Sequence, residues 1–185
     1  MSSAGVILVT GLQAAGKSTI GARLAARCER AAFIEGDMLW KMVASGREDM
    51  SADPSPEARG QYELRVRNGA LLADSFSRAG ITSVHADFVI GDNLARYTEW
   101  VTTRPLRIVM LTPRLDVVMQ RESGRSTDAY RSWIAAEGSL GAAVERFSSW
   151  LDETPRLGLW IDTSDQSPDE TVDHILAKWD DALVA

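Results

Sequence analysis

Residues 6–19, VILVTGLQAAGKST, are an apolar run followed directly by a glycine-rich segment. The segment has the complete pattern G-x-x-x-x-G-K-S/T at a junction between a predicted strand and a predicted helix. In such a loop the glycines let successive backbone N–H groups point at a phosphate, and the start of the following helix adds partial positive charge. With average composition the pattern arises by chance in about 1% of chains of this length. It therefore predicts a nucleotide-phosphate site rather than a glycine-rich turn that binds nothing.

The motif implies ATP and Mg²⁺ as ligands. Its lysine, Lys17, reaches the β- and γ-phosphates, and its hydroxyl residue, Ser18, is a magnesium ligand. The sequence contains neither the N-K-x-D nor the D-x-x-G signature of a usual GTPase, which favours ATP over GTP without excluding GTP. The chain barely has room for the further elements of a motor or AAA-type ATPase, so a small phosphotransferase fits best. The predicted ATP-binding residues are Gly11, Ala14, Ala15, Gly16, Lys17, Ser18 and Thr19.

Short apolar runs alternate with longer amphipathic stretches along the rest of the chain. This alternation predicts βαβ units in an α/β fold, with a five-stranded parallel sheet covered by helices on both faces. We expect residues 1–185 to form one domain, with a surface loop or lid at 46–56. The predicted strands are 6–10, 32–34, 81–86, 106–111 and 157–161, and the predicted helices are 17–28, 38–44, 57–78, 93–101, 115–122, 139–151 and 168–183.

Composition excludes several classes of protein. The net charge of −6 and the pI of about 5.0 argue against a general nucleic-acid binder, because phosphate neutralisation supplies most of the non-specific affinity. A single cysteine, Cys28, cannot form an internal disulfide. No apolar run is long enough to span a membrane, and no signal-peptide pattern stands at the N-terminus. We therefore expect a cytoplasmic protein without membrane contact, either a monomer or a homodimer.

Two aspartates follow predicted strands, at the sheet edge where open α/β folds bind ligands. Asp37 follows the second strand, and it is either the base that accepts the proton of an acceptor hydroxyl or the N-cap of the helix predicted from Met38. Asp87 follows the third strand, where it would direct magnesium and contact substrate, or would cap a turn. Which of the two is the base stays open. His85 and His174 lack metal-ligand spacing, so we expect both to be structural or surface residues.

Two arginines in a predicted lid, at about residues 122–137, are candidates for stabilising the transferred phosphoryl group. Arg121 ends the fifth predicted helix, and Arg125 follows across Gly124. The alternative is a pair of solvated arginines on an exposed turn.

The acceptor pocket is expected between the helix after Asp37, the 46–56 loop and the long helix from residue 57. Trp40, Tyr62 and Phe88 would form apolar walls, and Arg59 or Arg65 would bind a polar or anionic group. Aromatic residues at helical spacing are also typical of a core, so these side chains could instead be structural.

The chain resembles the small P-loop kinases over most of its length. Residues 11–19 with Glu35-Gly36-Asp37 are similar to the opening of adenylylsulfate and gluconate kinases. The later layout, with Asp87, Gly91, Arg121-Glu122 and Arg125, looks more like chloramphenicol phosphotransferase. The resemblance implies a P-loop kinase fold with a small helical lid. It also implies transfer of the γ-phosphate of ATP to a hydroxyl of an antibiotic or metabolite.

In this family the roles carry over residue by residue. Asp37 would be the general base, Lys17 the phosphate-binding lysine, Ser18 the magnesium ligand, and Arg121 and Arg125 the lid arginines. The loop lacks the serines of the chloramphenicol enzymes, and only fragments of the adenylylsulfate kinase pattern are present, so the acceptor stays open. Two alternatives also remain: a polynucleotide 5′-hydroxyl kinase and a nucleotide-binding regulatory P-loop protein.

Overall fold

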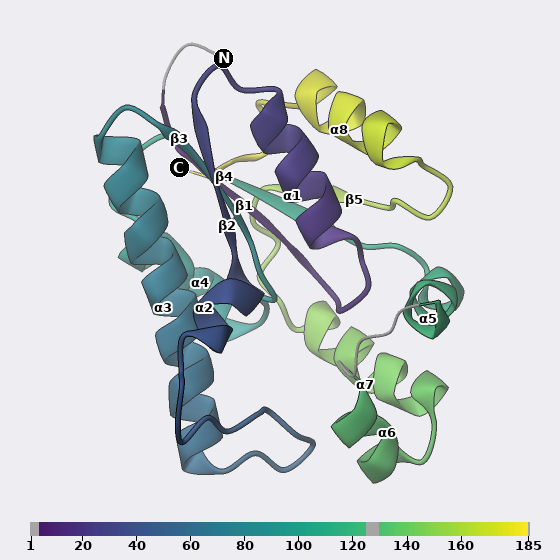
Figure 1. The fold of residues 1–185 in the computed structure, drawn as a ribbon. Helices are drawn as coiled ribbons and strands as arrows, with labels where there is room; N and C mark the ends of the chain where they lie inside the picture. The colour runs from purple at the N-terminus through teal and green to yellow at the C-terminus, as the bar shows by residue number, and fades with distance from the viewer. Residues whose placement is uncertain (1–3, 125–129, 185) are drawn as a thin grey trace.

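A twisted, mostly parallel sheet runs through the middle of the molecule (Figure 1). The computed structural model describes residues 4–124 and 130–184. Five parallel strands lie in the order β2-β3-β1-β4-β5, and a short sixth strand pairs antiparallel with β4. The predicted α/β fold with five parallel strands is thereby confirmed. The strands are β1 (Val6–Gly11), β2 (Ala31–Glu35), β3 (Thr82–Ala86), β4 (Leu106–Leu111), β5 (Leu159–Ile161) and β6 (Leu183–Val184).

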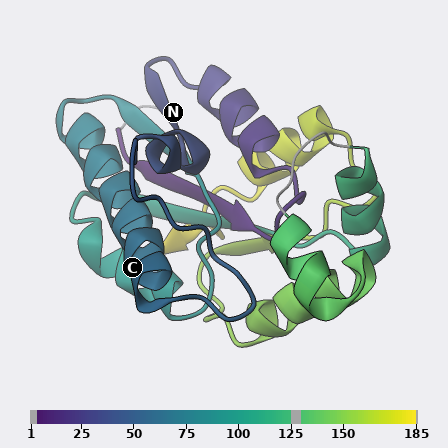
Figure 2. The ribbon, with the colours of Figure 1, turned by 60° about the horizontal axis from the view of Figure 1, so that its bottom comes forward.

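Helices cover both faces of this sheet (Figures 1 and 2). One face carries α1 (Lys17–Ala26) and α8 (Pro168–Ala177), and the other carries α3 (Pro56–Arg78), α4 (Asp92–Trp100) and α7 (Leu140–Asp152). Three further helices lie toward the carboxyl ends of the strands, in the lower half of Figure 1: α2 (Gly36–Lys41), α5 (Leu115–Ser123) and α6 (Arg131–Glu137). In the described residues, no helix is long and apolar enough to cross a membrane.

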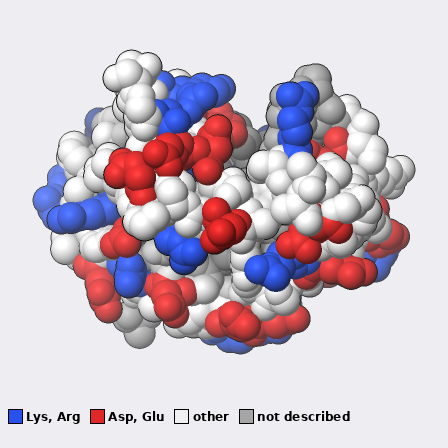
Figure 3. Space-filling model, turned by 90° about the horizontal axis from the view of Figure 1, so that it is seen from below, with Lys and Arg blue, Asp and Glu red and all other residues white. Residues whose placement is uncertain are grey.

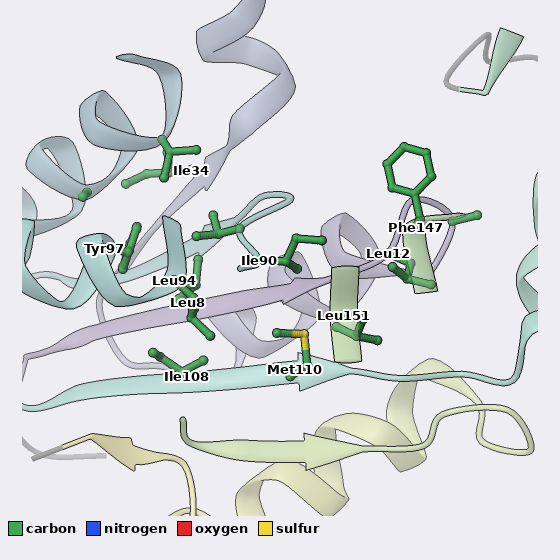
Figure 4. Packing of buried hydrophobic residues seen from close by; sticks show 14 of the residues in the cluster. Leu8, Leu12, Ile34, Ile90, Leu94, Tyr97, Ile108, Met110, Phe147 and Leu151 are labelled. Atoms are coloured by element: carbon green, nitrogen blue, oxygen red, sulfur yellow. The ribbon is translucent and has the colours of Figure 1, made fainter. Parts of the chain in front are cut away.

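The central strand β1 is buried on both sides, which explains its unbroken apolar sequence. Val6 and Leu8 pack into the core on the α3 and α4 side, whereas Ile7 and Val9 pack into the core beneath α1 and α8. Figure 4 shows the first of these cores, where Leu8, Ile108 and Met110 of the sheet meet Leu94 and Tyr97 of α4. Full burial of one such aliphatic side chain contributes about 1.5–3 kcal/mol. These two apolar layers hold the carboxyl end of β1 in a fixed place.

Several element boundaries differ from the sequence prediction for identifiable reasons. The last helix ends at Ala177 rather than at residue 183, because Leu183 and Val184 turn back to pair with the start of β4. The helix after β2 begins at Gly36 rather than Met38, with Glu35 as its N-cap. Its predicted cap, Asp37, is therefore inside the first turn, and this part of the prediction is wrong. Helix α6 falls inside the predicted lid, which the family resemblance implied to be helical, although the sequence pattern itself predicted no helix at these residues.

Candidate functional site

The glycine-rich loop has the backbone of a phosphate cradle. Ala14 (φ 62°) and Gly16 (φ 98°) both adopt left-handed conformations. Gly11 has φ 140°, and a Cβ there would lie 2.4 Å from the Leu111 carbonyl oxygen of β4. Helix α1 then begins at Lys17 with no side-chain cap in the described part of the chain and with no acidic residue in its first turn. Its first N–H groups can therefore donate to an anion, as the motif predicted.

The Lys17 ammonium lies at the mouth of this loop. Its Nζ donates a hydrogen bond to the Leu12 carbonyl oxygen at 2.8 Å and lies 5.9 Å from the centre of the Phe88 ring. Ser18 is half-buried in the first turn of α1, and among the described residues its hydroxyl has no hydrogen-bond partner. A hydroxyl in this position fits a magnesium ligand beside a bound nucleotide.

Arg121 extends from α5 to the same loop. Its guanidinium donates to the Thr163 carbonyl oxygen at 2.9 Å and makes a longer contact, 3.4 Å, with the Ala15 carbonyl oxygen. The lid prediction for Arg121 thus falls on a residue that contacts the phosphate loop. Arg125 lies outside the described residues. Tyr130, which sequence reasoning did not single out, is buried with its hydroxyl 3.4 Å from the Gln13 carbonyl oxygen, so the predicted lid segment itself reaches the loop.

A cavity of about 750 Å³ adjoins the phosphate loop through Gln13. Its volume falls in the usual range for a drug-sized ligand. Trp40 from α2, Tyr62 from α3 and Phe88 after β3 all line it, so the three predicted walls do meet at one place. The predicted 46–56 loop closes one side through Arg47, Asp49 and Met50.

Three further aromatic residues in the cavity wall were missed: Trp133 of α6 and Phe147 and Trp150 of α7. Their rings pack edge to face, with centroids 4.7 Å apart for Trp133 and Phe147 and 5.1 Å apart for Phe147 and Trp150. Phe88 meets Phe147 at 5.4 Å, which joins the two sides of the cavity. The spacing of Phe147 and Trp150 within one helix is also that of a core residue pair. The spacing of these residues therefore does not distinguish a cavity wall from a core. A predicted helix at the α6 residues would have been needed to bring Trp133 to this cavity.

Asp37 is the predicted carboxylate that faces this cavity. It is the second residue of α2, its side chain is exposed, and it lies in the cavity wall. Helix α2 starts at the carboxyl end of β2, so the carboxylate stands on the same sheet edge as the phosphate loop, with β3 between them.

Asp87 lies behind the wall rather than in it. Its Oδ1 accepts hydrogen bonds from Arg65 Nη2 at 2.8 Å and from the Phe88 backbone N–H at 2.7 Å. Its side chain is 3% exposed, and a Cβ on Gly36 would lie 2.1 Å from the Asp87 carboxyl carbon, so the backbone of Gly36 covers the carboxylate. Arg65, in contrast, does line the cavity. In this arrangement Asp87 pairs with Arg65, and among the described residues its buried Oδ2 has no hydrogen-bond partner, so its role toward magnesium or substrate stays a prediction.

The other predicted pocket arginine, Arg59, is exposed near the start of α3. Its Nε donates to the Pro54 carbonyl oxygen at 3.2 Å, and it is absent from the cavity wall that the described residues form. Of the two arginines expected to bind a polar group, the structure brings only Arg65 to the cavity.

His85 is buried beneath Asp87. Its Nε2 lies 3.7 Å from Asp87 Oδ2, and its Nδ1 lies 3.0 Å from the Tyr97 hydroxyl, whose ring stacks on the imidazole. Burial lowers the pKa of His85 to about 4, so the imidazole is neutral at physiological pH. Burial and the Asp87 charge also raise the pKa of Tyr62 above its ordinary value. Among the described residues no group of three or more His, Cys, Asp and Glu is placed to hold a metal, and His85 lies fully buried in the core.

No protein-family model and no curated protein sequence matches this chain. Solved structures do match. An APS kinase from Mycobacterium tuberculosis in complex with AMPPNP and APS aligns over 97% of this chain and 99% of its own, at 15% identity and a TM-score of 0.69. A gluconokinase from Sinorhizobium meliloti aligns over 96% and 92%, at 21% identity and a TM-score of 0.63. A tunicamycin resistance protein from Deinococcus radiodurans aligns over 98% and 99%, at 17% identity and a TM-score of 0.64.

At these identities the likeness concerns the fold, and it agrees with the strand order and the phosphate loop described above. The chain has the fold of the small P-loop kinases.

Proposed function

We propose that this protein is an ATP-dependent O-phosphotransferase that transfers the γ-phosphoryl group to a hydroxyl of a small molecule. The observation that carries the proposal is a ligand-sized cavity that adjoins the phosphate loop at Gln13 and has the Asp37 carboxylate in its wall. A loop that only held a nucleotide would not need a second compartment beside it. An APS kinase and a gluconokinase with the same fold support this reading.

The residues of the loop would bind and orient the nucleotide. The N–H groups at the start of α1 and the Lys17 ammonium would hold the β- and γ-phosphates, and Ser18 would ligate Mg²⁺. ATP with Mg²⁺ supplies the phosphoryl group and neutralises part of its charge. Arg121, anchored on Thr163 beside the loop, would donate to the transferred group from the lid side.

Asp37 would accept the proton of the acceptor hydroxyl as that oxygen attacks the γ-phosphorus. A carboxylate in this role must reach the hydroxyl within the acceptor compartment, and Asp37 is in the cavity wall whereas Asp87 is behind it. As part of the same proposal the protein acts in the cytoplasm, because ATP is available there.

The cavity also weighs against the two alternatives. A 5′-hydroxyl polynucleotide needs a basic groove for its phosphates, yet the cavity wall contains the carboxylates Asp37, Asp49, Asp92 and Glu153. A purely regulatory nucleotide-binding protein has no use for an aromatic compartment next to the γ-phosphate position.

The test is phosphate transfer from ATP to a panel of hydroxylated antibiotics, sugars, nucleosides and a 5′-hydroxyl oligonucleotide, read as a mass gain of one phosphate. With the acceptor found, Asp37→Asn should reduce turnover by about 10² to 10⁴ and leave ATP affinity nearly unchanged. Asp181→Asn is the matched control, since Asp181 is exposed near the C-terminus, away from the cavity. Turnover of the Asp37→Asn variant within threefold of the parent would remove Asp37 from the role of base.

A further inference from the structure

The walls of the cavity carry information about the acceptor. Six aromatic rings line it, and they come from five separate segments of the chain: α2, α3, the residues after β3, α6 and α7. Trp133 and Phe147 are buried, whereas Trp40, Tyr62, Phe88 and Trp150 are half-buried and present part of their surface. Flat ligand surfaces gain most from such walls, because ring contacts combine a large apolar area with a preferred geometry.

Among the described residues of the wall, the basic side chain that is largely buried is Arg65, and it is paired with a buried carboxylate. Arg65 is 12% exposed and its partner Asp87 is 3% exposed, with Nη2 and Oδ1 2.8 Å apart. The guanidinium also lies 5.8 Å from the centre of the Trp40 ring and 5.3 Å from that of Tyr62. Arg65 therefore serves to hold two aromatic walls, and its charge is balanced by a buried carboxylate.

The remaining charges in the wall are exposed and include more acidic than basic groups. Among the described residues of the wall, Lys41, Arg47 and Arg131 accompany Asp37, Asp49, Asp92 and Glu153, which makes three cations to four carboxylates once Arg65 is paired with Asp87. Figure 3 shows the face seen from below, where acidic and basic side chains of the described residues are interspersed without a continuous basic patch. An anionic ligand group is normally bound where basic groups outnumber acidic ones, and the described part of this wall has no such excess of positive charge.

We infer that the acceptor is an uncharged or cationic molecule with a flat apolar or aromatic part, and not an anionic metabolite. The inference rests on the proposed function, because it takes this cavity as the acceptor compartment. It separates the protein from the APS kinase and the gluconokinase of the same fold, whose named substrates are anions.

Three matched glycosides test this inference by isothermal titration calorimetry on the full chain with Mg²⁺ and a non-hydrolysable ATP analogue. 4-Nitrophenyl β-glucoside is aromatic and neutral, methyl β-glucoside lacks the ring, and 4-nitrophenyl β-glucuronide replaces the CH₂OH group by a carboxylate. We expect the first to bind at least about tenfold more tightly than either of the others. Equal or tighter binding of the glucuronide, no advantage from the aryl ring, or no binding of either aryl glycoside overturns the inference.

Asp87→Asn tests the charge argument directly. This variant keeps a hydrogen-bond acceptor for Arg65 but removes the charge that matches it, so affinity for the glucuronide should rise by about tenfold and affinity for the aryl glucoside should change little. An unchanged preference in a variant that folds, as judged by circular dichroism, contradicts the role of Asp87. If the variant does not fold, the comparison of the three glycosides on the parent protein still decides the inference.

Failure of the inference and failure of the proposed function give different results. Calorimetry reports binding alone, and phosphate transfer from ATP is measured separately by mass. Selective binding of the aryl glucoside in a protein that phosphorylates no acceptor contradicts the proposed function only. Phosphorylation of gluconate or of the glucuronide in preference to neutral acceptors supports the function and overturns the inference.

Discussion

The buried imidazole of His85 should make the stability of the fold depend on pH. Its side chain is fully buried between Gly69 of α3, Tyr97 of α4 and the Asp87 carboxylate. Burial lowers the pKa of His85 to about 4 in the folded protein, against about 6.5 for an exposed histidine. Lowering the pH from 7 to 5 should therefore change the free energy of unfolding through this side chain.

The sign follows from which state binds the proton. Between pH 6.5 and 4 the unfolded chain protonates this histidine and the folded protein does not, so acid stabilises the unfolded state. The stability that comes from a neutral His85 is fully present above pH 6.5 and is lost as the pH falls toward 4. With these two pKa values, the free energy of unfolding should fall by about 2 kcal/mol between pH 7 and pH 5.

Urea unfolding at both pH values, on the parent and on His85→Asn, measures this term. Asparagine keeps a polar group near the position of Nδ1, opposite the Tyr97 hydroxyl, and it does not titrate. The variant will be less stable at both pH values because it leaves a cavity, so the readout is the difference between pH 7 and 5. We expect this difference to be about 2 kcal/mol smaller in His85→Asn than in the parent. Equal pH dependence in the parent and in His85→Asn would refute the reasoning.

Three further outcomes are expected. Lys17→Ala should weaken ATP binding by at least about tenfold, measured by calorimetry, because it removes the ammonium at the loop mouth; unchanged affinity would contradict the phosphate assignment. Arg121→Met should lower turnover by about 10²-fold with a smaller effect on ATP affinity, and a loss confined to ATP affinity would make it a ground-state contact. Gly36→Ala should cost about 1–3 kcal/mol in urea unfolding, because its Cβ meets the Asp87 carboxyl at 2.1 Å. Gly60→Ala, with open space around its Cβ, is the control and should not destabilise.

The phosphate-loop part of the candidate site could be predicted because its determinants are local in sequence. The motif fixes where β1 ends and where α1 begins, and the glycines stand where the loop takes left-handed φ values, as at Gly16. The alternation of apolar runs with amphipathic stretches was likewise sufficient to predict the sheet and the helices on both of its faces. This works because the unbroken apolar sequence of a strand indicates that the strand is buried on both faces. For the phosphate loop and the strands, the position of a residue in the sequence is therefore enough to place it in the fold.

The cavity beside the phosphate loop, which we propose as the acceptor compartment, could be predicted only in part, because its residues come together through tertiary packing. Trp40, Tyr62 and Phe88 do line one cavity; they were expected there because Trp40 and Phe88 follow predicted strands and Tyr62 lies in the long predicted helix beside them. Trp133 depends on α6, a seven-residue helix with few signals of its own, and its packing on Phe147 joins segments that sequence spacing does not relate. Asp87 had the right position in the chain for a functional carboxylate, yet Arg65 and Gly36 enclose it, and neither contact is visible in the sequence.

These contacts give the tripeptide Glu35-Gly36-Asp37 a physical explanation beyond its resemblance to a family motif. Gly36 is a glycine because the Asp87 carboxylate occupies the space where a side chain would stand. The same close approach brings the start of α2 against the end of β3, and Asp37 is the next residue, in the cavity wall. Asp87 therefore acts on the site without touching the acceptor: through Gly36 it fixes where Asp37 stands, and through Arg65 it fixes the aromatic wall. Asp87→Ala, which removes the hydrogen-bond acceptor as well as the charge, should disturb the proposed base and the acceptor compartment together, whereas Asp87→Asn keeps an acceptor for Arg65 and should disturb them little. In both variants the phosphate loop, held by the two cores around β1, should continue to bind nucleotide.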